Sequence, residues 1–307
     1  VQKVSDIEAD HAIGSRTVRF GELYGTLPTP TKTGYHFEGW YLDDGTFENK
    51  VESTTAVATA LNHTLYSKWT PNTYYVKFNP NGPEGVTLMP NQQFTYDEEP
   101  KALSKNTYEY PGYIFRGWAT NETLNAETYE KRVKYKDGAE VKNLTSEPNG
   151  IFNLYAVWEP RTVTVTFNLN DVTDGTGSTE ATFTIDALNT NAEMFVKFSD
   201  KFSELYLTDE NSIIGIPSAT RDGYKFAGWF TGKTAGEKVT ESTVAESIVV
   251  PDSLAIILYA RWTANPYTVT YDGNGGTVNG DGSTTTVQGA GATFDANYTY
   301  RPNDGTN

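Results

Sequence analysis

The chain has 307 residues, a formal net charge of −15 at pH 7, 13% aromatic residues and no cysteine. A negative field of this size repels nucleic acid and anionic membranes, so we expect neither as a partner. Without cysteine there is no disulfide and no thiol chemistry. The longest apolar run, "LAIILYA" at residues 254–260, is far too short to cross a membrane.

In chain order the predicted elements begin with "TVRFGELYG" at residues 17–25, which we predict to be the second strand of a unit whose first strand is not recognisable. The segment "TLPTPTKTG" at 26–34 follows, and its prolines predict an extended connector. "GYHFEGWY" at 34–41 is the next predicted strand, and a variable loop separates it from "LYSKW" at 65–69. These segments predict a small module built from strands.

Both tryptophan-bearing phrases recur twice more. "GYIFRGWA" and "GYKFAGWF" occupy 112–119 and 223–230, while "LYAVW" and "LYARW" occupy 154–158 and 258–262. Constant phrases at variable spacing are typical of repeated modules whose insertions fall in surface loops. We predict a structural role, and not a catalytic one, for the residues that define the phrases: Gly34, Tyr35, Phe37, Trp40, Trp69, Gly112, Tyr113, Phe115, Trp118, Trp158, Gly223, Tyr224, Phe226, Trp229 and Trp262.

A third phrase follows each LYxxW: "YYVKFNPNG" at 74–82, "VTVTFNLND" at 163–171 and "YTVTYDGNGG" at 267–276. Each alternates apolar and polar residues before Asn, Asp and Gly, a pattern that predicts a half-buried strand entering a tight turn. No segment shows a long helical period. The best candidates for a short helix are 197–206 and 242–250.

We divide the chain into repeat 1 (residues 1–70, lacking its first strand), repeat 2 (71–160), repeat 3 (161–264, with a long insertion) and a partial repeat 4 (265–307, a first hairpin only). Short linkers with proline separate these ranges, and proline stiffens such joints. We therefore expect modules that follow one another end to end. The chain opens on Val1 without a signal-peptide pattern, so we expect it to be an interior piece of a longer protein.

Alternation within a strand predicts which residues of GYxFxGW share a face. In the first copy Tyr35, Phe37 and Gly39 would point one way, and His36 and Trp40 the other. We expect the three phenylalanines in the core and the tryptophans against the connector. The variable middle residues of the phrase should face water: His36, Ile114 and Lys225.

Residues that could carry chemistry are few. The three histidines, His11, His36 and His63, lack metal-ligand spacing and are expected at the surface. "DVTDGTG" at 171–177 and "DGNGGTVNGDG" at 272–282 could supply oxygen ligands for calcium, but hairpin turns explain them with fewer assumptions. We therefore predict no catalytic residue, no cofactor and no metal site, with calcium in these turns left open.

The phrases "YTVTYDGNGG", "YGTLPTPTKTGYHFEGWY" and "LYARW" together resemble the Listeria–Bacteroides repeat family, and the resemblance covers nearly the whole chain. It implies a mainly β, β-grasp-like module that occurs in tandem on secreted or wall-anchored bacterial proteins. It implies no catalysis and a contribution to adhesion or partner contact. This chain departs from the pattern through insertions around 119–149 and 171–216.

The leading hypothesis is a non-catalytic stalk or adhesin segment of a bacterial cell-surface or secreted protein, with protein or glycan partners outside the cell. The alternative is a glycan-binding module that uses exposed loop aromatics such as Tyr129 or Tyr135. The half-repeats at the two ends also suggest head-to-tail self-association by strand addition. A piece cut from a longer chain is the simpler explanation of these half-repeats, and we favour it.

Overall fold

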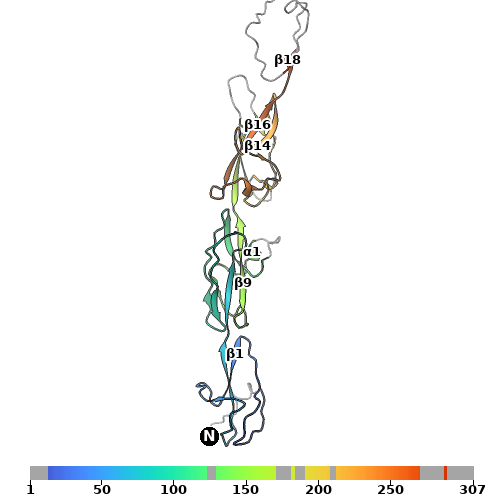
Figure 1. The fold of residues 1–307 in the computed structure, drawn as a ribbon. Coiled ribbons are helices and arrows are strands. Elements are labelled where there is room, and N and C mark those ends of the chain that lie inside the picture. Colours follow the sequence, from blue (N-terminus) through green and yellow to red (C-terminus); the bar gives the residue numbers. More distant parts are fainter. Residues whose placement is uncertain are drawn as a thin grey trace, which may run out of the picture. The chain divides into compact units, whose positions relative to one another are not determined.

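The protein is described by a computed structural model, which describes residues 13–122, 129–170, 181–183, 191–207, 212–269 and 287–288. Strands dominate these residues, as expected (Figure 1). The chain divides into two compact units: unit 1 is Val1–Tyr110 with Ile114–Glu159, and unit 2 is Pro111–Tyr113 with Pro160–Asn307. The boundaries of the four repeats stay a prediction, and we keep their names for the sequence ranges given above.

Repeat 1 contributes a three-stranded antiparallel sheet to unit 1. Strand β1 (Tyr35–Tyr41) lies between β2 (Lys50–Val51) and β3 (Tyr66–Pro71). Its small core consists of Tyr24, Val51 and Val57. The sheet therefore contains both tryptophan phrases but has little buried apolar surface beneath them.

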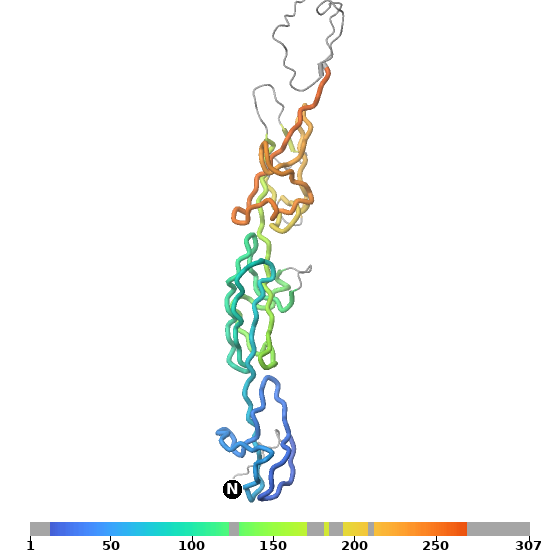
Figure 2. Tube along the Cα trace, viewed as in Figure 1, coloured from blue at the N-terminus to red at the C-terminus, as the bar shows by residue number. Residues whose placement is uncertain are grey.

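Repeat 2 forms a four-stranded sheet with the order β5 (Gln92–Thr95), β4 (Thr73–Asn79), β9 (Ile151–Pro160), β7 (Tyr113–Ala119). Strands β4 and β9 pair in parallel although more than 70 residues separate the partners Lys77 and Asn153 (Figure 2). Outside this sheet, β6 (Lys101–Ala102) pairs with β8 (Glu140–Val141), and helix α1 is Tyr129–Arg132.

Unit 2 contains a five-stranded sheet with the order β12 (Asn191–Lys197), β10 (Thr162–Asn168), β16 (Ala255–Ala264), β14 (Tyr224–Phe230), β15 (Lys238–Val239). The first and last long strands, β10 and β16, are central and parallel. This is the strand order of a β-grasp sheet, as the resemblance implies. Two small sheets complete the unit, β11 (Thr182–Phe183) with β13 (Ala219–Thr220) and β17 (Thr268–Val269) with β18 (Val287–Gln288).

Binary patterning explains the central strands. In β10, Val163, Val165 and Phe167 are fully buried, while the threonines between them are at least partly exposed. A period of two places one row of side chains on the core and the other toward water. The two segments expected to hold a short helix contain one 3₁₀ turn each, at Phe202–Glu204 and Ala245–Ser247.

Candidate functional site: the tryptophan phrases and the Gly-Tyr turn

The glycine before tryptophan in GYxFxGW forms a β-bulge. The register shifts between Phe37 and Gly39 in the β1–β3 pair, and at the equivalent position in β14–β16. Gly39 has φ +140°, a conformation that glycine adopts far more readily than other residues. A bulge adds one residue to the strand and turns the following side chains to the other face. The expected alternation is therefore wrong at this point, because the rings of Phe37 and Trp40 share a face, 5.6 Å apart.

One phenylalanine lies between two tryptophans in all three copies. Ring centroids are 5.0–5.6 Å apart in all six pairs: Phe37 with Trp40 and Trp69, Phe115 with Trp118 and Trp158, and Phe226 with Trp229 and Trp262. The phenylalanines were expected in the core, but all three are only half-buried. The middle residues of the phrase, His36, Ile114 and Lys225, are exposed. The tryptophan of the phrase is buried in the second and third copies, whereas in the first copy Trp40 is half-buried and Tyr41 is the buried aromatic.

A second phenylalanine, on the first strand of the repeat, completes this burial. Phe78 on β4 lies 4.9 Å from Trp118, and Phe167 on β10 lies 4.8 Å from Trp229. These tryptophans are 0% and 1% exposed. Edge-to-face and tilted aromatic pairs at these distances add stability beyond the area that they bury. In repeats 2 and 3 the first strand therefore covers the tryptophan of GYxFxGW and excludes it from solvent.

The indole N–H groups mostly bond to backbone of their own repeat. Trp40 donates to the Pro28 carbonyl at 2.8 Å, and Trp229 donates to the Pro217 carbonyl at 2.6 Å. These two carbonyls belong to the connector before each phrase. The last-strand tryptophans donate to Ser67 Oγ, Pro80 O and Leu169 O. The buried indole nitrogen of Trp118 has no hydrogen-bond partner in the described part of the chain.

The Gly-Tyr turn that opens GYxFxGW makes the same backbone contact in each copy. The carbonyl of Gly34 accepts a hydrogen bond from Asn72 N at 2.8 Å, and Gly112 accepts one from Arg161 N at 2.9 Å. Gly223 accepts one from Asn265 N at 2.8 Å. Each donor is the third residue after the last tryptophan of the phrase pair. The turn thus holds the start of the segment that leads into the next repeat.

In the first two copies an aromatic ring lies against the glycine of this turn, whereas none of the described atoms lies within 4 Å of a Cβ built on Gly223. A Cβ atom on Gly34 would collide with the ring of Tyr96, and one on Gly112 would collide with the ring of Phe198. The glycines are therefore required by close approach as well as by their φ values of +79° and +82°. Sequence reasoning missed these rings. The signal that could have found them is an aromatic residue directly after the second strand of each repeat, because Tyr96 follows β5 and Phe198 follows β12.

In unit 1 a polar network surrounds the Tyr96 contact. Tyr35 Oη donates to Asp97 Oδ2 at 2.9 Å, and Asn143 Nδ2 donates to Asp97 Oδ1 at 2.7 Å. Asp97 N donates to Asn143 Oδ1 at 2.7 Å, and Lys32 Nζ lies 3.7 Å from the centre of the Tyr35 ring. The hydrogen bonds from Asn143 and Tyr35 lower the pKa of Asp97, while the bond to Asp97 raises the pKa of Tyr35.

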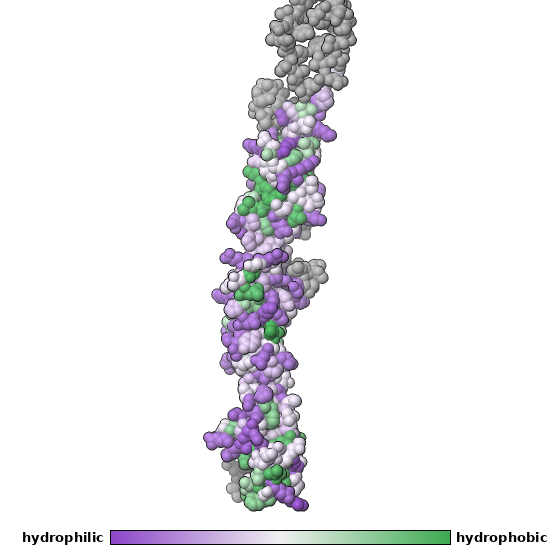
Figure 3. Space-filling view, viewed as in Figure 1, coloured by the Kyte–Doolittle hydropathy of each residue, from purple (hydrophilic) through white to green (hydrophobic). Residues whose placement is uncertain are grey.

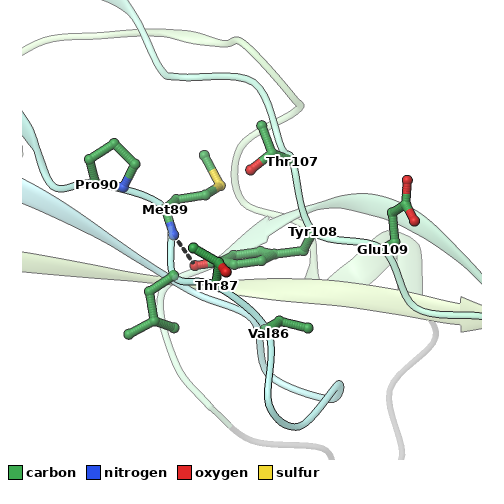
Figure 4. Close-up of a pocket in the computed structure, with 8 residues that line it drawn as sticks. Val86, Thr87, Met89, Pro90, Thr107, Tyr108 and Glu109 are labelled. Carbon is green, nitrogen blue, oxygen red and sulfur yellow. Dashed lines mark hydrogen bonds between the residues drawn. The ribbon is translucent and has the colours of Figure 1, made fainter.

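A shallow recess of about 440 Å³ lies in repeat 2, lined by residues 86–90 and 107–109. Figure 4 shows the Tyr108 hydroxyl turned toward the backbone nitrogen of Met89, from which it accepts a hydrogen bond at 3.0 Å. The same hydroxyl donates to the carbonyl of Phe78 at 2.7 Å. The Tyr108 hydroxyl makes both of these hydrogen bonds within the fold. We therefore assign the recess to packing and not to ligand binding.

The remaining candidate residues take structural positions. His63 was expected at the surface, but it is half-buried, with Nε2 2.6 Å from Tyr24 Oη and Nδ1 2.9 Å from the Leu61 carbonyl. Tyr129 and Tyr135 are also half-buried. His11 and the segments weighed for calcium, 171–177 and 272–282, lie outside the described residues. Within the described ranges no three His, Asp or Glu side chains group as metal ligands, and no helix is long and apolar enough to span a membrane.

The chain is similar to parts of longer bacterial proteins. It is 37% identical to internalin H of Listeria monocytogenes over 112 residues, which is 36% of this chain and 18% of that protein. It is 27% identical to a protein of Evansella cellulosilytica named as a membrane protein, over 89% of this chain and 32% of that protein. The chain thus spans about a third or less of these relatives.

Among solved structures, the type 2 repeat of the mucus binding protein MUB from Lactobacillus reuteri aligns with 63% of this chain and all of that repeat, at 11% identity and a TM-score of 0.15. The sequence model of the Listeria-Bacteroides repeat domain matches residues 8–68, 74–156 and 195–261. Because the three matches to this family model cover more than half of the chain, the chain belongs to the Listeria–Bacteroides repeat family.

Proposed function

We propose that this chain is a non-catalytic spacer segment of a bacterial cell-surface or secreted protein, in which consecutive repeats set the distance between other parts. The observation that carries the proposal is that the same three-ring cluster of one phenylalanine and two tryptophans recurs in three repeats. These aromatics pack within their own repeats, so the residues that define the family serve to build modules.

A position outside the cell is part of the proposal. Internalin H, a relative in the same family, supports a surface role for such repeats. The net charge of −15 favours solubility of a tandem array and disfavours contact with anionic lipid. Protein or glycan partners at a host or matrix surface would then meet exposed loops. The narrower glycan-binding alternative loses support, because the loop tyrosines chosen for it are half-buried.

A repeat exchange tests the spacer proposal. In the full-length protein, residues 71–160 are deleted in one variant and replaced by a second copy of 161–264 in another. A spacer predicts that deletion reduces the reach of a distal epitope above the cell surface, and that the replacement restores it. If the replacement restores the reach but abolishes adhesion to host cells or matrix, residues of repeat 2 bind a partner and the pure spacer role is wrong.

Head-to-tail self-association is a separate proposal. It would join a first strand such as β17 of one copy to repeat 1 of another, giving a contact that does not close on itself. Light scattering of the whole chain over a range of concentrations tests it. Growth of the mass with concentration supports association, whereas a constant monomer mass contradicts it.

A further inference from the structure

Four Asn-Gly pairs occur in the sequence, and two of them lie in described parts of repeat 2, at 81–82 and 149–150. The pairs at 274–275 and 279–280 lie outside the described residues. In an Asn-Gly pair the backbone nitrogen of the glycine can attack the side-chain carbonyl of the asparagine, because glycine has no Cβ to hinder the approach. The two described pairs differ in how firmly the structure holds the asparagine.

The two asparagines have nearly the same backbone φ. Asn81 has φ +49° and Asn149 has φ +55°, both in the left-handed region that asparagine tolerates better than most residues. The φ angle therefore does not distinguish the pairs. The hydrogen bonds of the side chains and the space around each glycine decide which pair reacts.

The side chain of Asn81 is held in place. Its Nδ2 donates a hydrogen bond to the Ala156 carbonyl on β9 at 2.8 Å, and the residue is half-buried. The following Gly82 lies against two rings, because a Cβ built on it would be 2.7 Å from Tyr110 and 3.2 Å from Trp158. Attack at this pair must break the side-chain bond and shift Gly82 against these rings.

The side chain of Asn149 is not held in this way. The residue is exposed in a turn, and its side-chain amide makes no hydrogen bond within the described ranges. Figure 3 shows hydrophilic side chains over much of the visible surface of repeat 2. The attacking nitrogen of Gly150 donates to the Glu147 carbonyl at 3.1 Å. Among the described contacts, this backbone bond is the one that the attack must break.

We propose that Asn149 is a site of spontaneous covalent modification, at which the side-chain amide is converted to aspartate and isoaspartate. The Gly150 nitrogen attacks Cγ of Asn149 and forms a new N–Cγ bond. The bond from Cγ to Nδ2 breaks, and ammonia leaves with the proton that the Gly150 nitrogen gives up. Water then hydrolyses one of the two carbonyl–nitrogen bonds of the resulting succinimide ring. The reaction needs water alone, so it does not depend on the spacer role.

The direction of hydrolysis decides the structural effect. Asn149 N donates to the Thr73 carbonyl at 2.7 Å, and Tyr75 N donates to the Gly150 carbonyl at 2.8 Å. These two bonds attach the turn to β4 just before the first parallel partners, Tyr75 and Ile151. In isoaspartate the main chain runs through Cγ, which adds one carbon atom between the two bonded groups. Both bonds cannot then keep their geometry, so isoaspartate loosens the start of the β4–β9 pair, whereas aspartate leaves the main chain unchanged.

Timed incubation of the whole chain in mildly alkaline buffer tests the site. Peptide mapping by mass spectrometry, with fragmentation that distinguishes aspartate from isoaspartate, reads each Asn-Gly pair separately. We expect Asn149 to convert at least about fivefold faster than Asn81, the factor that a net difference of one ordinary hydrogen bond gives. The synthetic peptide SEPNGIF, residues 146–152, is incubated alongside to show that the conditions convert an unrestrained pair.

Hydrogen exchange in residues 73–76 tests the structural effect. Exchange there should become faster in the aged chain as isoaspartate accumulates at 149, because the bonds to the turn are lost. Asn149→Gly is the matched control, since glycine keeps a positive φ and has no amide to cyclise; its exchange should not change on ageing. Fresh Asn149→Asp carries the new charge on a normal main chain, and it should exchange like the fresh unmodified chain.

Three results would overturn the proposal. Equal conversion of Asn81 and Asn149 would mean that the fold does not select the site. Retention of the Asn149 amide after the peptide has fully converted would mean that the turn protects it. Unchanged exchange in 73–76 despite isoaspartate at 149 would mean that the modification leaves the β4–β9 pair intact.

Discussion

The phenolic oxygen of Tyr35 lies 2.9 Å from Oδ2 of Asp97 and donates a hydrogen bond to it. This bond joins the start of β1 to the turn that follows β5, so it links repeats 1 and 2 within unit 1. The Tyr96 ring against Gly34 and the backbone bond from Asn72 to Gly34 lie beside it. The glycine and tyrosine of GYxFxGW thus make the contact between repeats, while its phenylalanine and tryptophan build the module.

The contact at Asp97 should depend on pH. Its hydrogen bonds hold the pKa below the ordinary value of 3.8, so the carboxylate is favoured in the folded state. The contribution is therefore present above pH 3.8 and is lost as the pH falls through the lowered pKa. NMR of the whole chain should show the Asn143 side-chain amide moving as Asp97 titrates below pH 3.8. In Asp97→Asn this movement should vanish, and persistence of the movement would contradict the assignment.

Gly34→Ala should loosen the contact between repeats 1 and 2. The new Cβ would collide with the Tyr96 ring, and φ is +79°. Gly25→Ala is the matched control, because φ there is +66° and open space surrounds the Cβ. Both variants carry the cost of about 1–2 kcal/mol for a left-handed alanine, but only Gly34→Ala should speed hydrogen exchange at Asn72. Equal exchange at Asn72 in the two variants would show that the ring contact is unimportant.

Substitution by phenylalanine should reduce stability by different amounts at two buried tryptophans. Trp229→Phe removes the N–H that bonds to the Pro217 carbonyl, whereas the indole nitrogen of Trp118 has no partner among the described residues. Leaving a buried carbonyl unsatisfied costs about 1–3 kcal/mol. Trp229→Phe should therefore lower the free energy of unfolding of its own repeat by roughly this much more than Trp118→Phe lowers that of repeat 2. Urea unfolding followed by fluorine NMR of labelled tryptophan compares them, and a larger loss in Trp118→Phe contradicts the prediction.

The glycines before the tryptophans should also differ in how well they tolerate substitution by alanine. A Cβ on Gly117 would lie 2.6 Å from the backbone oxygen of Tyr135, whereas one on Gly39 would meet the flexible Lys50 side chain at 2.8 Å. Their φ values, +143° and +140°, impose nearly the same backbone strain, which costs about 1–3 kcal/mol. Gly117→Ala should therefore destabilise its repeat more than Gly39→Ala, because only a side chain can move aside. Thermal unfolding of both variants measures the difference, and the reverse order would contradict the structure.

Most strands were predictable, since β10 follows its alternating pattern and the family resemblance implied the sheet. The strand expected at 17–25 is wrong, because in that segment only Leu23 makes an isolated bridge, with Ala56. The strand faces on which the side chains of GYxFxGW lie could not be predicted. A bulge at Gly39 moves Trp40 onto the face of Phe37, and alternation alone cannot reveal an extra residue. The pairing of Tyr35 with Asp97 was also out of reach, because 62 residues separate them and no local period links the two. His63 differs from expectation because it bonds to Tyr24.

Fluorine NMR of the whole chain, with every tryptophan carrying a 5-fluoro label, tests the central claim most directly. Each tryptophan pair belongs to one repeat, so signals should disappear in pairs as urea increases: Trp40 with Trp69, Trp118 with Trp158, and Trp229 with Trp262. The first pair should be lost at the lowest urea concentration, because repeat 1 has the smallest core. A single midpoint shared by all six signals would contradict the account, since it would mean one common core and not a series of modules.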